Sequence, residues 1–153
     1  MLRRAAVLVA LVTLLFLPTH SRTASAADNP LQGVWQMMDA SGQMAGLYIF
    51  AGTHYSMMLA STTRPDIANI GAATADEVRS LYDPMIANAG VYEVAGNLVT
   101  IRPIAAKFPV VMKPGAYEVY AFRIDDKTLS LTQQRNVRGP VQGGATRTLV
   151  RVE

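Results

Sequence analysis

Short β-type segments separated by turn residues dominate the chain from residue 31 to its end. Apolar and polar positions alternate in runs of five to nine residues, and clusters of Gly, Asn, Asp or Pro lie between the runs. Because most neighbouring runs are joined by short turns, the pattern favours an all-β, up-and-down antiparallel barrel over the competing sandwich. The eight predicted strands cover residues 31–38, 46–50, 54–60, 90–94, 98–104, 116–124, 128–134 and 145–152.

One short helix is predicted between the third and fourth strands. Thr74 and Glu77 have the spacing of a capping box, in which each side chain accepts a hydrogen bond from the backbone of the other. Val78, Leu81 and Tyr82 follow at the i, i+3 and i+4 positions of one apolar stripe. An Asp-Pro pair comes directly after this stripe, and it ends the helix.

The first 26 residues have the pattern of a secretory signal peptide. Arg3 and Arg4 precede an uncharged run over 5–17, and the small residues Ala24 and Ala26 fit the site that an export peptidase cleaves. The 13 residues of this run, at ~1.5 Å rise each, are too few for the ~30 Å core of a bilayer, so we expect no stable membrane anchor. We therefore expect a signal peptide over 1–26, one barrel domain over 27–153, and a periplasmic or secreted location.

Removal of the signal peptide changes the charge of the chain. The full sequence of 153 residues holds 14 basic and 11 acidic residues, a formal net charge of +3. Arg3, Arg4 and Arg22 lie in the predicted signal peptide, so the mature domain has 11 residues of each sign and no net charge. Because these charges are dispersed and balanced, they give no support for nucleic-acid binding.

Several kinds of chemistry lack the residues they need. The chain has no cysteine, which excludes disulfides, thiol nucleophiles and cysteine-ligated metals. His54 is the one histidine of the mature domain, so a zinc site built on several histidines is excluded as well. We find no Gly-x-Ser-x-Gly elbow and no phosphate-binding glycine motif. We therefore expect no metal and no other cofactor, and the sequence contains no recognisable catalytic constellation.

The predicted strands are rich in methionine and tyrosine, which suits a binding cavity. Methionine is flexible and polarizable, and tyrosine joins an apolar ring to a hydroxyl, so together they fit an apolar pocket with a few polar anchors. Arg102 and Arg123 stand in otherwise apolar strands, and an arginine turned into a barrel has to be paired or to bind an anion. The predicted ligand-binding residues are Tyr48, His54, Tyr55, Tyr92, Arg102, Tyr120 and Arg123.

Each of these residues also has a purely structural interpretation. The methionines and tyrosines can simply fill the core, His54 can be a turn residue in water, and Arg123 can lie outside the barrel near a turn. Period-2 alternation places Tyr55 and His54 on opposite faces of their strand, and either face is apolar enough to be core. In the sixth strand Arg123 and Glu118 likewise fall on opposite faces, and Glu118 shares its face with Tyr120.

Parts of the sequence resemble a known family. Gly33-Val34-Trp35 in the first predicted strand matches the Gly-x-Trp signature of lipocalins and related calycin barrels. The segments 46–50, 54–58, 64–65, 87–94 and 149–153 look like bacterial lipocalin-like domain proteins, so the resemblance covers nearly all of the predicted mature chain. It implies an eight-stranded calycin-type barrel, and most members of this group have no established activity.

The resemblance also implies how one end of the barrel is closed. In calycins a basic residue near the last strand lies across the signature tryptophan, and Arg151, or failing it Arg147, matches that residue here. Gly33, Trp35 and Arg151 are therefore the expected barrel-closing residues. Related lipocalin-like sequences often carry a histidine pair in the fifth strand, where this chain has Thr100-Ile101-Arg102.

Three classes of function follow from this pattern. The first is an exported barrel that binds a small, largely apolar molecule, whose carboxylate or carbonyl is held by Arg102 or Arg123 with tyrosine hydroxyls. The second is an interaction module, such as an inhibitor of a secreted hydrolase, that uses the leader over 27–30. The third is an isomerase or cyclase for an apolar substrate, using His54 and Arg102. A cavity of roughly 300 Å³ or more favours a ligand, and a solid interior favours the interaction module.

Overall fold

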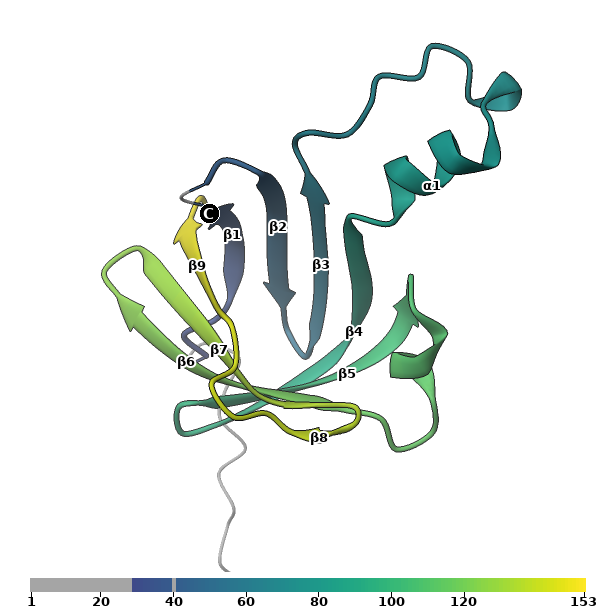
Figure 1. Cartoon of the computed structure of the whole chain (residues 1–153). Coiled ribbons are helices and arrows are strands. Elements are labelled where there is room, and N and C mark those ends of the chain that lie inside the picture. Colours follow the sequence, from purple (N-terminus) through teal and green to yellow (C-terminus); the bar gives the residue numbers. More distant parts are fainter. Residues whose placement is uncertain (1–28, 40) are drawn as a thin grey trace, which may run out of the picture.

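Eight antiparallel strands close into a barrel, as the sequence pattern predicts (Figure 1). The computed structural model describes residues 29–39 and 41–153, so the predicted signal peptide lies outside the described residues. Each strand from β1 to β7 pairs with the next, β7 pairs with β9, and the pairing of β1 with β9 closes the ring. The ring consists of β1 (Gly33–Met38), β2 (Met44–Ala51), β3 (His54–Ser61), β4 (Met85–Ala95), β5 (Leu98–Ala106), β6 (Glu118–Asp125), β7 (Thr128–Asn136) and β9 (Thr146–Arg151).

Most strand bounds lie within two residues of the sequence-based prediction, and two assignments differ more. β4 begins at Met85, five residues before the predicted start at Gly90. Its first part contains Ala87-Asn88-Ala89, residue types with low β-propensity, and only the pairing with β3 and β5 makes them a strand. The predicted loop over 135–144 contains the two-residue strand β8 (Gly139–Pro140), which pairs with the end of β7.

One face of every strand forms the core. In β3, Tyr55, Met57 and Leu59 are buried, whereas His54, Ser56 and Met58 are exposed. This settles the register that the sequence left open. The fully assembled core consists of Leu31, Trp35, Tyr48, Phe50, Tyr55, Met57, Leu59, Tyr92, Val99, Ile101, Tyr120, Leu129, Leu131 and Leu149.

Trp35 and Arg151 lie together at one end of the barrel. The Trp35 side chain is fully buried, and its Nε1 donates a hydrogen bond of 2.8 Å to the carbonyl oxygen of Leu31. The Arg151 guanidinium lies 4.1 Å from the centre of the indole ring, in a cation–π contact. Arg151 also donates to the carbonyl oxygens of Gln32 and Pro30, at 2.5 and 2.8 Å. Arg151, and not Arg147, therefore lies across the tryptophan.

Gly33 lets the last residues of the chain pass close to β1. Its φ of 122° lies in the region that side chains disfavour. A Cβ at this position would lie 2.3 Å from the carbonyl oxygen of Glu153 and 2.8 Å from Nη1 of Arg151. The backbone amide of Val34 donates to the same Glu153 oxygen at 2.9 Å. The first and last strands thus meet at a point where only glycine fits.

The residues that precede β1 are fastened to this closed end. Nδ2 of Asn29 donates to the Tyr92 hydroxyl at 2.6 Å, and Nε2 of Gln32 donates to the same hydroxyl at 3.0 Å. Gln32 also exchanges hydrogen bonds of 2.8 and 3.1 Å with the backbone of Gly52. The described part of the predicted leader therefore packs against the barrel, so it is not a free extension.

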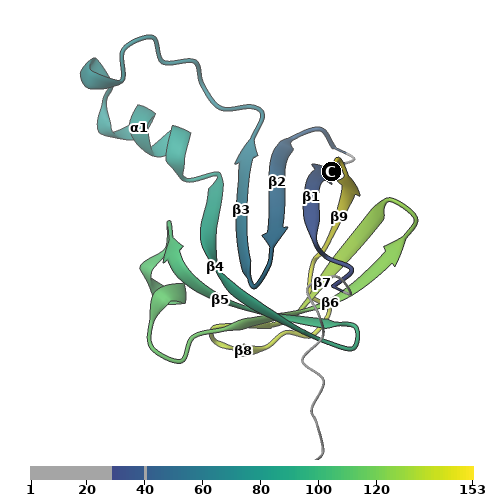
Figure 2. The ribbon, with the colours of Figure 1, turned by 180° about the vertical axis from the view of Figure 1, so that it is seen from behind.

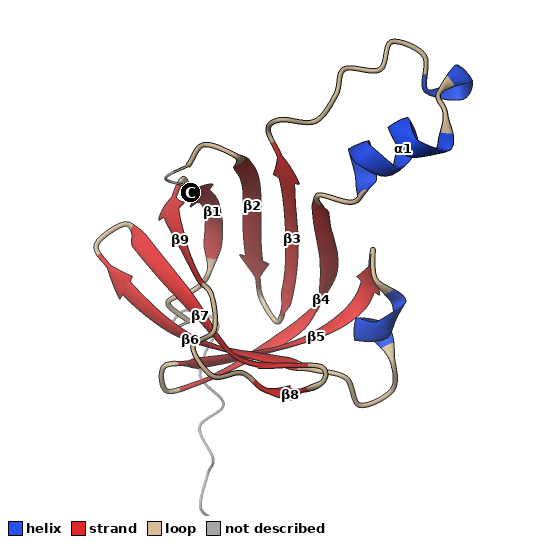
Figure 3. Cartoon of the chain, in the orientation of Figure 1, coloured by secondary structure: helices blue, strands red, loops and turns tan. Residues whose placement is uncertain are grey.

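The short helix between β3 and β4 forms where the capping box predicts it. Helix α1 (Ala75–Tyr82) begins after Thr74, whose Oγ1 accepts from the amide of Glu77 at 3.3 Å, while Glu77 Oε2 accepts from the amide of Thr74 at 2.8 Å. Figures 1, 2 and 3 show α1 and its connecting loops standing away from the barrel, beyond the end of β3. No residue of α1 is buried, so the predicted apolar stripe covers no core.

Lys107 fastens the end of α1 to the barrel. Its Nζ donates to the carbonyl oxygens of Asp83 and Met85, both at 3.1 Å, and to that of Tyr82. A cation at this position satisfies carbonyl groups that the last turn of a helix leaves unpaired. Lys107 thus joins the residues just after β5 to the segment that links α1 with β4.

Candidate ligand site

A cavity of about 150 Å³ lies inside the barrel at the end away from Trp35. Strand β9 shows this arrangement most simply, because Arg151 at its end lies on Trp35 and Arg147 near its start lines the cavity. Apolar walls come from β3, β4 and the 3₁₀ turn Pro109–Met112. The residues that line the cavity are Met57, Ile86, Ala87, Asn88, Ala106, Phe108, Val111, Glu118, Tyr120, Gln133 and Arg147.

Three polar side chains on β6 and β7 form a hydrogen-bonded chain along one wall. The Tyr120 hydroxyl donates to Glu118 Oε2 at 3.0 Å, and Gln133 Nε2 donates to the Tyr120 hydroxyl at 3.3 Å. Glu118 is 8% exposed and Tyr120 is 5% exposed. These hydrogen bonds hold the Glu118 carboxylate by its Oε2 atom. The other oxygen, Oε1, makes no hydrogen bond within the described part of the protein.

Arg147 on β9 brings a positive charge to the same cavity, near the hydroxyls of Tyr48 and Tyr120. Its side chain is half-buried, and it forms no ion pair with any described residue. The ion pairs that the described residues do form are all at the surface, where Arg79, Arg102 and Arg123 each meet a carboxylate. Arg147 therefore differs from these arginines in both burial and pairing.

Two tyrosine hydroxyls next to these charges have no hydrogen-bond partner among the described residues. Tyr48 and Tyr55 are each 4% exposed, and the hydroxyl oxygen of each is fully buried. Burial raises the pKa of both phenols, and the nearby Glu118 carboxylate adds to the effect. Arg147 acts against burial on the pKa of Tyr48, so it lies near that hydroxyl, although without the geometry of a hydrogen bond. A buried hydroxyl without a partner costs about 1–3 kcal/mol.

Burial also controls the ionisation of Glu118. Removal from water raises the pKa of its carboxyl group above the ordinary value near 4.5. The hydrogen bond from Tyr120 and the charge of Arg147 act in the opposite direction, and they only partly offset burial. Glu118 is therefore a stronger base, once ionised, than a glutamate at the surface.

The structure gathers some of the predicted ligand-binding residues and separates others. Tyr48, Tyr55 and Tyr120 all lie in the polar layer around Glu118 and Arg147. Tyr92 is buried too, but its hydroxyl accepts hydrogen bonds from Asn29 and Gln32 at the end of the barrel where Trp35 and Arg151 lie.

His54, Arg102 and Arg123 lie on the outside of the barrel. His54 is exposed at the β2–β3 turn, with Nδ1 3.3 Å from Oγ1 of Thr53. Arg102 pairs with Glu93 at 3.1 Å on the outer face, and Arg123 pairs with Asp125 at 3.4 Å beside a turn. The expectation that one of these arginines turns into the barrel is therefore corrected, because strand alternation keeps both charges in water.

Sequence reasoning missed the two charged residues that do line the cavity. Glu118 shares a face of β6 with Tyr120 and two further apolar residues, which already placed it on the more apolar face. Arg147 lies four residues before Arg151 on β9, so alternation puts both on the inner face. The sequence therefore contained the information that places Glu118 and Arg147 inside the barrel. It could be used only once the inward-pointing face of each strand was known.

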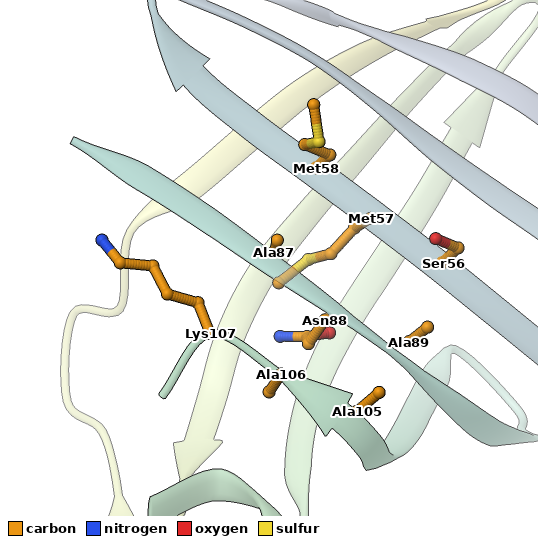
Figure 4. A pocket seen from close by; sticks show the side chains of 9 residues that line it. All are labelled: Ser56, Met57, Met58, Ala87, Asn88, Ala89, Ala105, Ala106 and Lys107. Atoms are coloured by element: carbon orange, nitrogen blue, oxygen red, sulfur yellow. The ribbon is translucent and has the colours of Figure 1, made fainter. Parts of the chain in front are cut away.

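A second hollow lies on the outside of the same wall (Figure 4). Its volume is about 410 Å³, and it shares Met57, Ala87, Asn88 and Ala106 with the interior cavity. Figure 4 shows Met57, Asn88 and Ala106 grouped between the strands, while the Lys107 ammonium points away from them. Asn88 is 9% exposed and its Oδ1 has no hydrogen-bond partner. Met57 and Asn88 thus stand between the outer hollow and the cavity.

The pairing of β4 with β5 is irregular next to this wall. The register shifts between Ala89 and Gly90, where Ala89 pairs with Ala105 but Gly90 pairs with Pro103. A Cβ on Gly90 would lie 2.1 Å from the carbonyl oxygen of Arg102, so this approach requires glycine. A bulge of this kind weakens the ladder locally, and it does so beside the side chains that separate the two hollows.

Over residues 29–39 and 41–153, no three His, Asp or Glu side chains lie together in a way that would hold a metal ion. No helix in the same described ranges is long and apolar enough to cross a membrane.

The fold and the site together define an eight-stranded antiparallel barrel with a small cavity at one end, where Glu118, Tyr120 and Arg147 contribute polar groups to the lining. No family model matches the sequence, and no curated protein matches it. Among solved structures, the chain is similar to the REP1-NXSQ fatty acid transporter, at 12% sequence identity and a TM-score of 0.38. The similarity covers 80% of this chain and 96% of that one. At this level it says nothing about the ligand of the present protein.

Proposed function

We propose that the protein binds a small, largely apolar molecule inside the barrel and holds its carbonyl or carboxylate group at Arg147. The observation that carries this proposal is the position of Arg147, a half-buried guanidinium that lines a cavity and has no ion pair among the described residues. Removing such a charge from water is costly unless it gains a partner. A ligand oxygen provides that partner, with a charge-assisted hydrogen bond.

The volume of the cavity limits the size of the ligand. At about 150 Å³ it is smaller than the roughly 300–1,000 Å³ that hold drug-sized molecules. An engineered protein cavity of this volume holds benzene, so one six-membered ring is a suitable guide. A larger molecule would insert one end, and its remainder would pass Met57 and Asn88 towards the outer hollow.

The apolar and the polar residues that line the cavity would contact different parts of the ligand. Met57, Ile86, Phe108 and Val111 offer apolar contacts, which favour a ring or a short chain. Arg147 and the neighbouring tyrosine layer contribute donors at one end only. The site therefore favours a molecule with a single oxygen-bearing group and an apolar remainder.

The proposal is tested with three ring compounds that differ in one group: cyclohexanone, benzoate and cyclohexane. We expect the first two to bind the wild-type protein, and the Arg147→Met variant to bind them at least tenfold more weakly, because a hydrogen bond to a charged group contributes about 1.5–3 kcal/mol. Affinity for cyclohexane should stay the same. Affinities are measured by titration with NMR detection.

Arg102→Met is the matched control, since it removes the same charge from the outer face. It should leave all three affinities unchanged. If Arg102→Met weakens binding as much as Arg147→Met does, or if the wild type binds neither oxygen-bearing compound, the proposed site is wrong.

We also propose that the protein is exported, with cleavage after Ala26. The support is the charge, length and small-residue pattern of the first 26 residues. N-terminal sequencing of the protein expressed in a bacterium tests this. The proposal expects Ala27 as the first residue of the mature protein, and a mature chain that still begins at Met1 contradicts it.

A protein–protein interaction module is the second candidate function. The outer faces of β1, β2 and β3 expose large apolar side chains, among them Met38, Leu47, Ile49 and Met58, at 40–56% exposure. Apolar patches of this kind often mark contact surfaces. The version that relies on a free leader is weakened, because Asn29 and Pro30 are bonded to the barrel. Loss of hydrolase inhibition in a Leu47→Lys variant would favour this candidate.

A further inference from the structure

We propose that Glu118 is the general base of a proton-transfer reaction on a small neutral carbonyl compound whose oxygen is held by Arg147. This inference rests on the proposed function, because it uses the same cavity. It goes further, since it assigns a reaction and narrows the ligand to a carbonyl compound with hydrogen on the neighbouring carbon.

The Glu118 carboxylate has the placement that a base needs. It lines the cavity at the start of β6, and Tyr120 fixes its Oε2 through the 3.0 Å hydrogen bond. Gln133 in turn orients the Tyr120 hydroxyl. Oε1 makes no hydrogen bond within the described residues, so one oxygen of a fixed carboxylate stays available. A base held by a second group in this way is the usual arrangement of general acid–base sites.

Glu118 and Arg147 line the same cavity without pairing with each other. Opposite charges on flexible side chains normally close into an ion pair, as the described surface pairs do. Here the guanidinium and the carboxylate remain apart, and each influences the other only through its charge. A ligand can therefore contact both groups at once, with its oxygen at Arg147 and its carbon chain towards Glu118.

The same arrangement favours a neutral carbonyl group over a carboxylate. A ligand carboxylate at Arg147 would carry its negative charge close to ionised Glu118, and like charges in a poorly hydrated cavity repel, so benzoate should bind more weakly than cyclohexanone while Glu118 is ionised. A ketone or aldehyde oxygen has no net charge in the ground state. It gains negative charge only during reaction, when the guanidinium stabilises it most.

The reaction is a reversible shift of a proton. The Oε1 lone pair of Glu118 forms a bond to a hydrogen on the carbon next to the carbonyl, and the C–H electron pair becomes a C=C bond. The C=O π electrons move to oxygen, which becomes an enolate oxygen facing Arg147. When the C=O bond re-forms, the C=C electrons take the proton back from Glu118, at the same carbon or, in an unsaturated ketone, two carbons further on. No oxidant, reductant or water is consumed.

Other lining residues do not offer an alternative base. Glu118 is the single carboxylate among the residues that line the cavity, and the remainder are apolar, amide, phenol or guanidinium side chains. Tyr48, Tyr55 and Tyr120 are phenols whose burial raises their pKa, so they stay protonated. Burial makes Glu118 a stronger base by the same physical cause.

The test uses 3-cyclohexen-1-one, a six-membered ring that suits the cavity. We expect the wild-type protein to convert it to the conjugated 2-cyclohexen-1-one, followed by ultraviolet absorbance, and to exchange its hydrogens in D2O, followed by NMR. The Glu118→Gln variant should lose at least 100-fold of the acceleration, the lower end of what a positioned base contributes. Glu118→Asp should retain part of it, because a shorter base remains.

Glu93→Gln is the matched control, since Glu93 is an exposed glutamate on the outer face. It should isomerise the probe at the wild-type rate. The wild-type acceleration should fall as the pH is lowered through the pKa of Glu118, which faces Tyr120, Arg147, Tyr48 and Tyr55.

Probe binding is measured by NMR in the same samples, so two failures are distinguishable. If the wild type binds the probe and does not accelerate its isomerisation, or if Glu118→Gln is as active as the wild type, the catalytic proposal is overturned while the binding proposal stands. If the wild type does not bind the probe, both are overturned. Unfolding curves of Glu118→Gln and Glu118→Asp show that activity is compared between folded proteins.

Discussion

At the scale of single residues, strand alternation decides which charges meet inside the barrel. Glu118 and Arg147 occupy inner positions of β6 and β9, whereas Arg102 and Arg123 occupy outer positions of β5 and β6. Glu118 and Arg147 are partly removed from water, and neither forms an ion pair with a described residue. Arg102 and Arg123, by contrast, each pair with a carboxylate at the surface. The binding and catalytic proposals both follow from this difference.

The buried Glu118 carboxyl should make stability depend on pH in a defined direction. Because its pKa is raised in the folded protein, the folded state holds the proton more tightly than the unfolded state, where the pKa is near 4.5. Its contribution to the free energy of unfolding is therefore complete below about pH 4.5, and it is lost as the pH rises through the folded pKa. Urea unfolding at a series of pH values measures this loss.

The Glu118→Gln variant should lack that loss. Relative to the wild type, its free energy of unfolding should increase as the pH rises through the same window, and then stay constant. A difference between the two proteins that does not change with pH would show that Glu118 has an ordinary pKa.

The sequence could predict part of this site. It placed Tyr48, Tyr55 and Tyr120 among the ligand-binding residues, and all three lie in the polar layer. It selected Arg102 and Arg123 because a charge in an apolar strand stands out, yet both are at outer positions. Which face of a strand points inward depends on contacts with strands far away in the sequence, so Arg147 could be found only after the barrel was assembled.

At the scale of elements, Lys107 supplies the side-chain hydrogen bonds that join the end of helix α1 to the described part of the barrel. No residue of α1 is buried, and Lys107 bonds three carbonyl groups at and after its last turn. Local rules suffice for the helix itself, since the capping box and the apolar stripe predict its bounds. They do not predict that it stands off the barrel, because that depends on which surface remains uncovered.

Lys107→Met should loosen this element without unfolding the barrel. We expect faster amide hydrogen exchange over residues 75–83, and unchanged exchange in β1 and β9, because the lost bonds hold only the helix end. Lys113→Met serves as the control, since that lysine is exposed and its side chain forms no hydrogen bond with any described residue. Equal protection of α1 in both variants would mean that something other than Lys107 holds it.

At the scale of the whole molecule, the barrel is closed where its first and last strands meet. Gly33, Trp35 and Arg151 form this junction, and the pattern of eight strands with short turns predicted the closed ring correctly. The size of the cavity at the other end could not be predicted, because it depends on how side chains from six strands pack. At about 150 Å³ it falls between the hollow and the solid interior that the sequence left open.

Gly33→Ala should disrupt this junction. A Cβ 2.3 Å from the Glu153 carbonyl oxygen, together with a positive φ, should lower the free energy of unfolding by roughly 1–3 kcal/mol beyond the control. The control is Gly139→Ala, which has a φ of 139° but no atom within 4 Å of the added Cβ. Trp35, the single tryptophan, reports the change through its fluorescence. Equal losses in the two variants would show that the close approach at Gly33 is unimportant.

The central claim is that the interior cavity, and not the outer apolar face, receives the ligand. The most direct measurement is the set of nuclear Overhauser contacts between bound cyclohexanone and the methyl groups of the wild-type protein. The account predicts contacts to Met57, Ile86 and Val111, which line the cavity. Contacts confined to Leu47 and Ile49, which are exposed on the outer face, would contradict it.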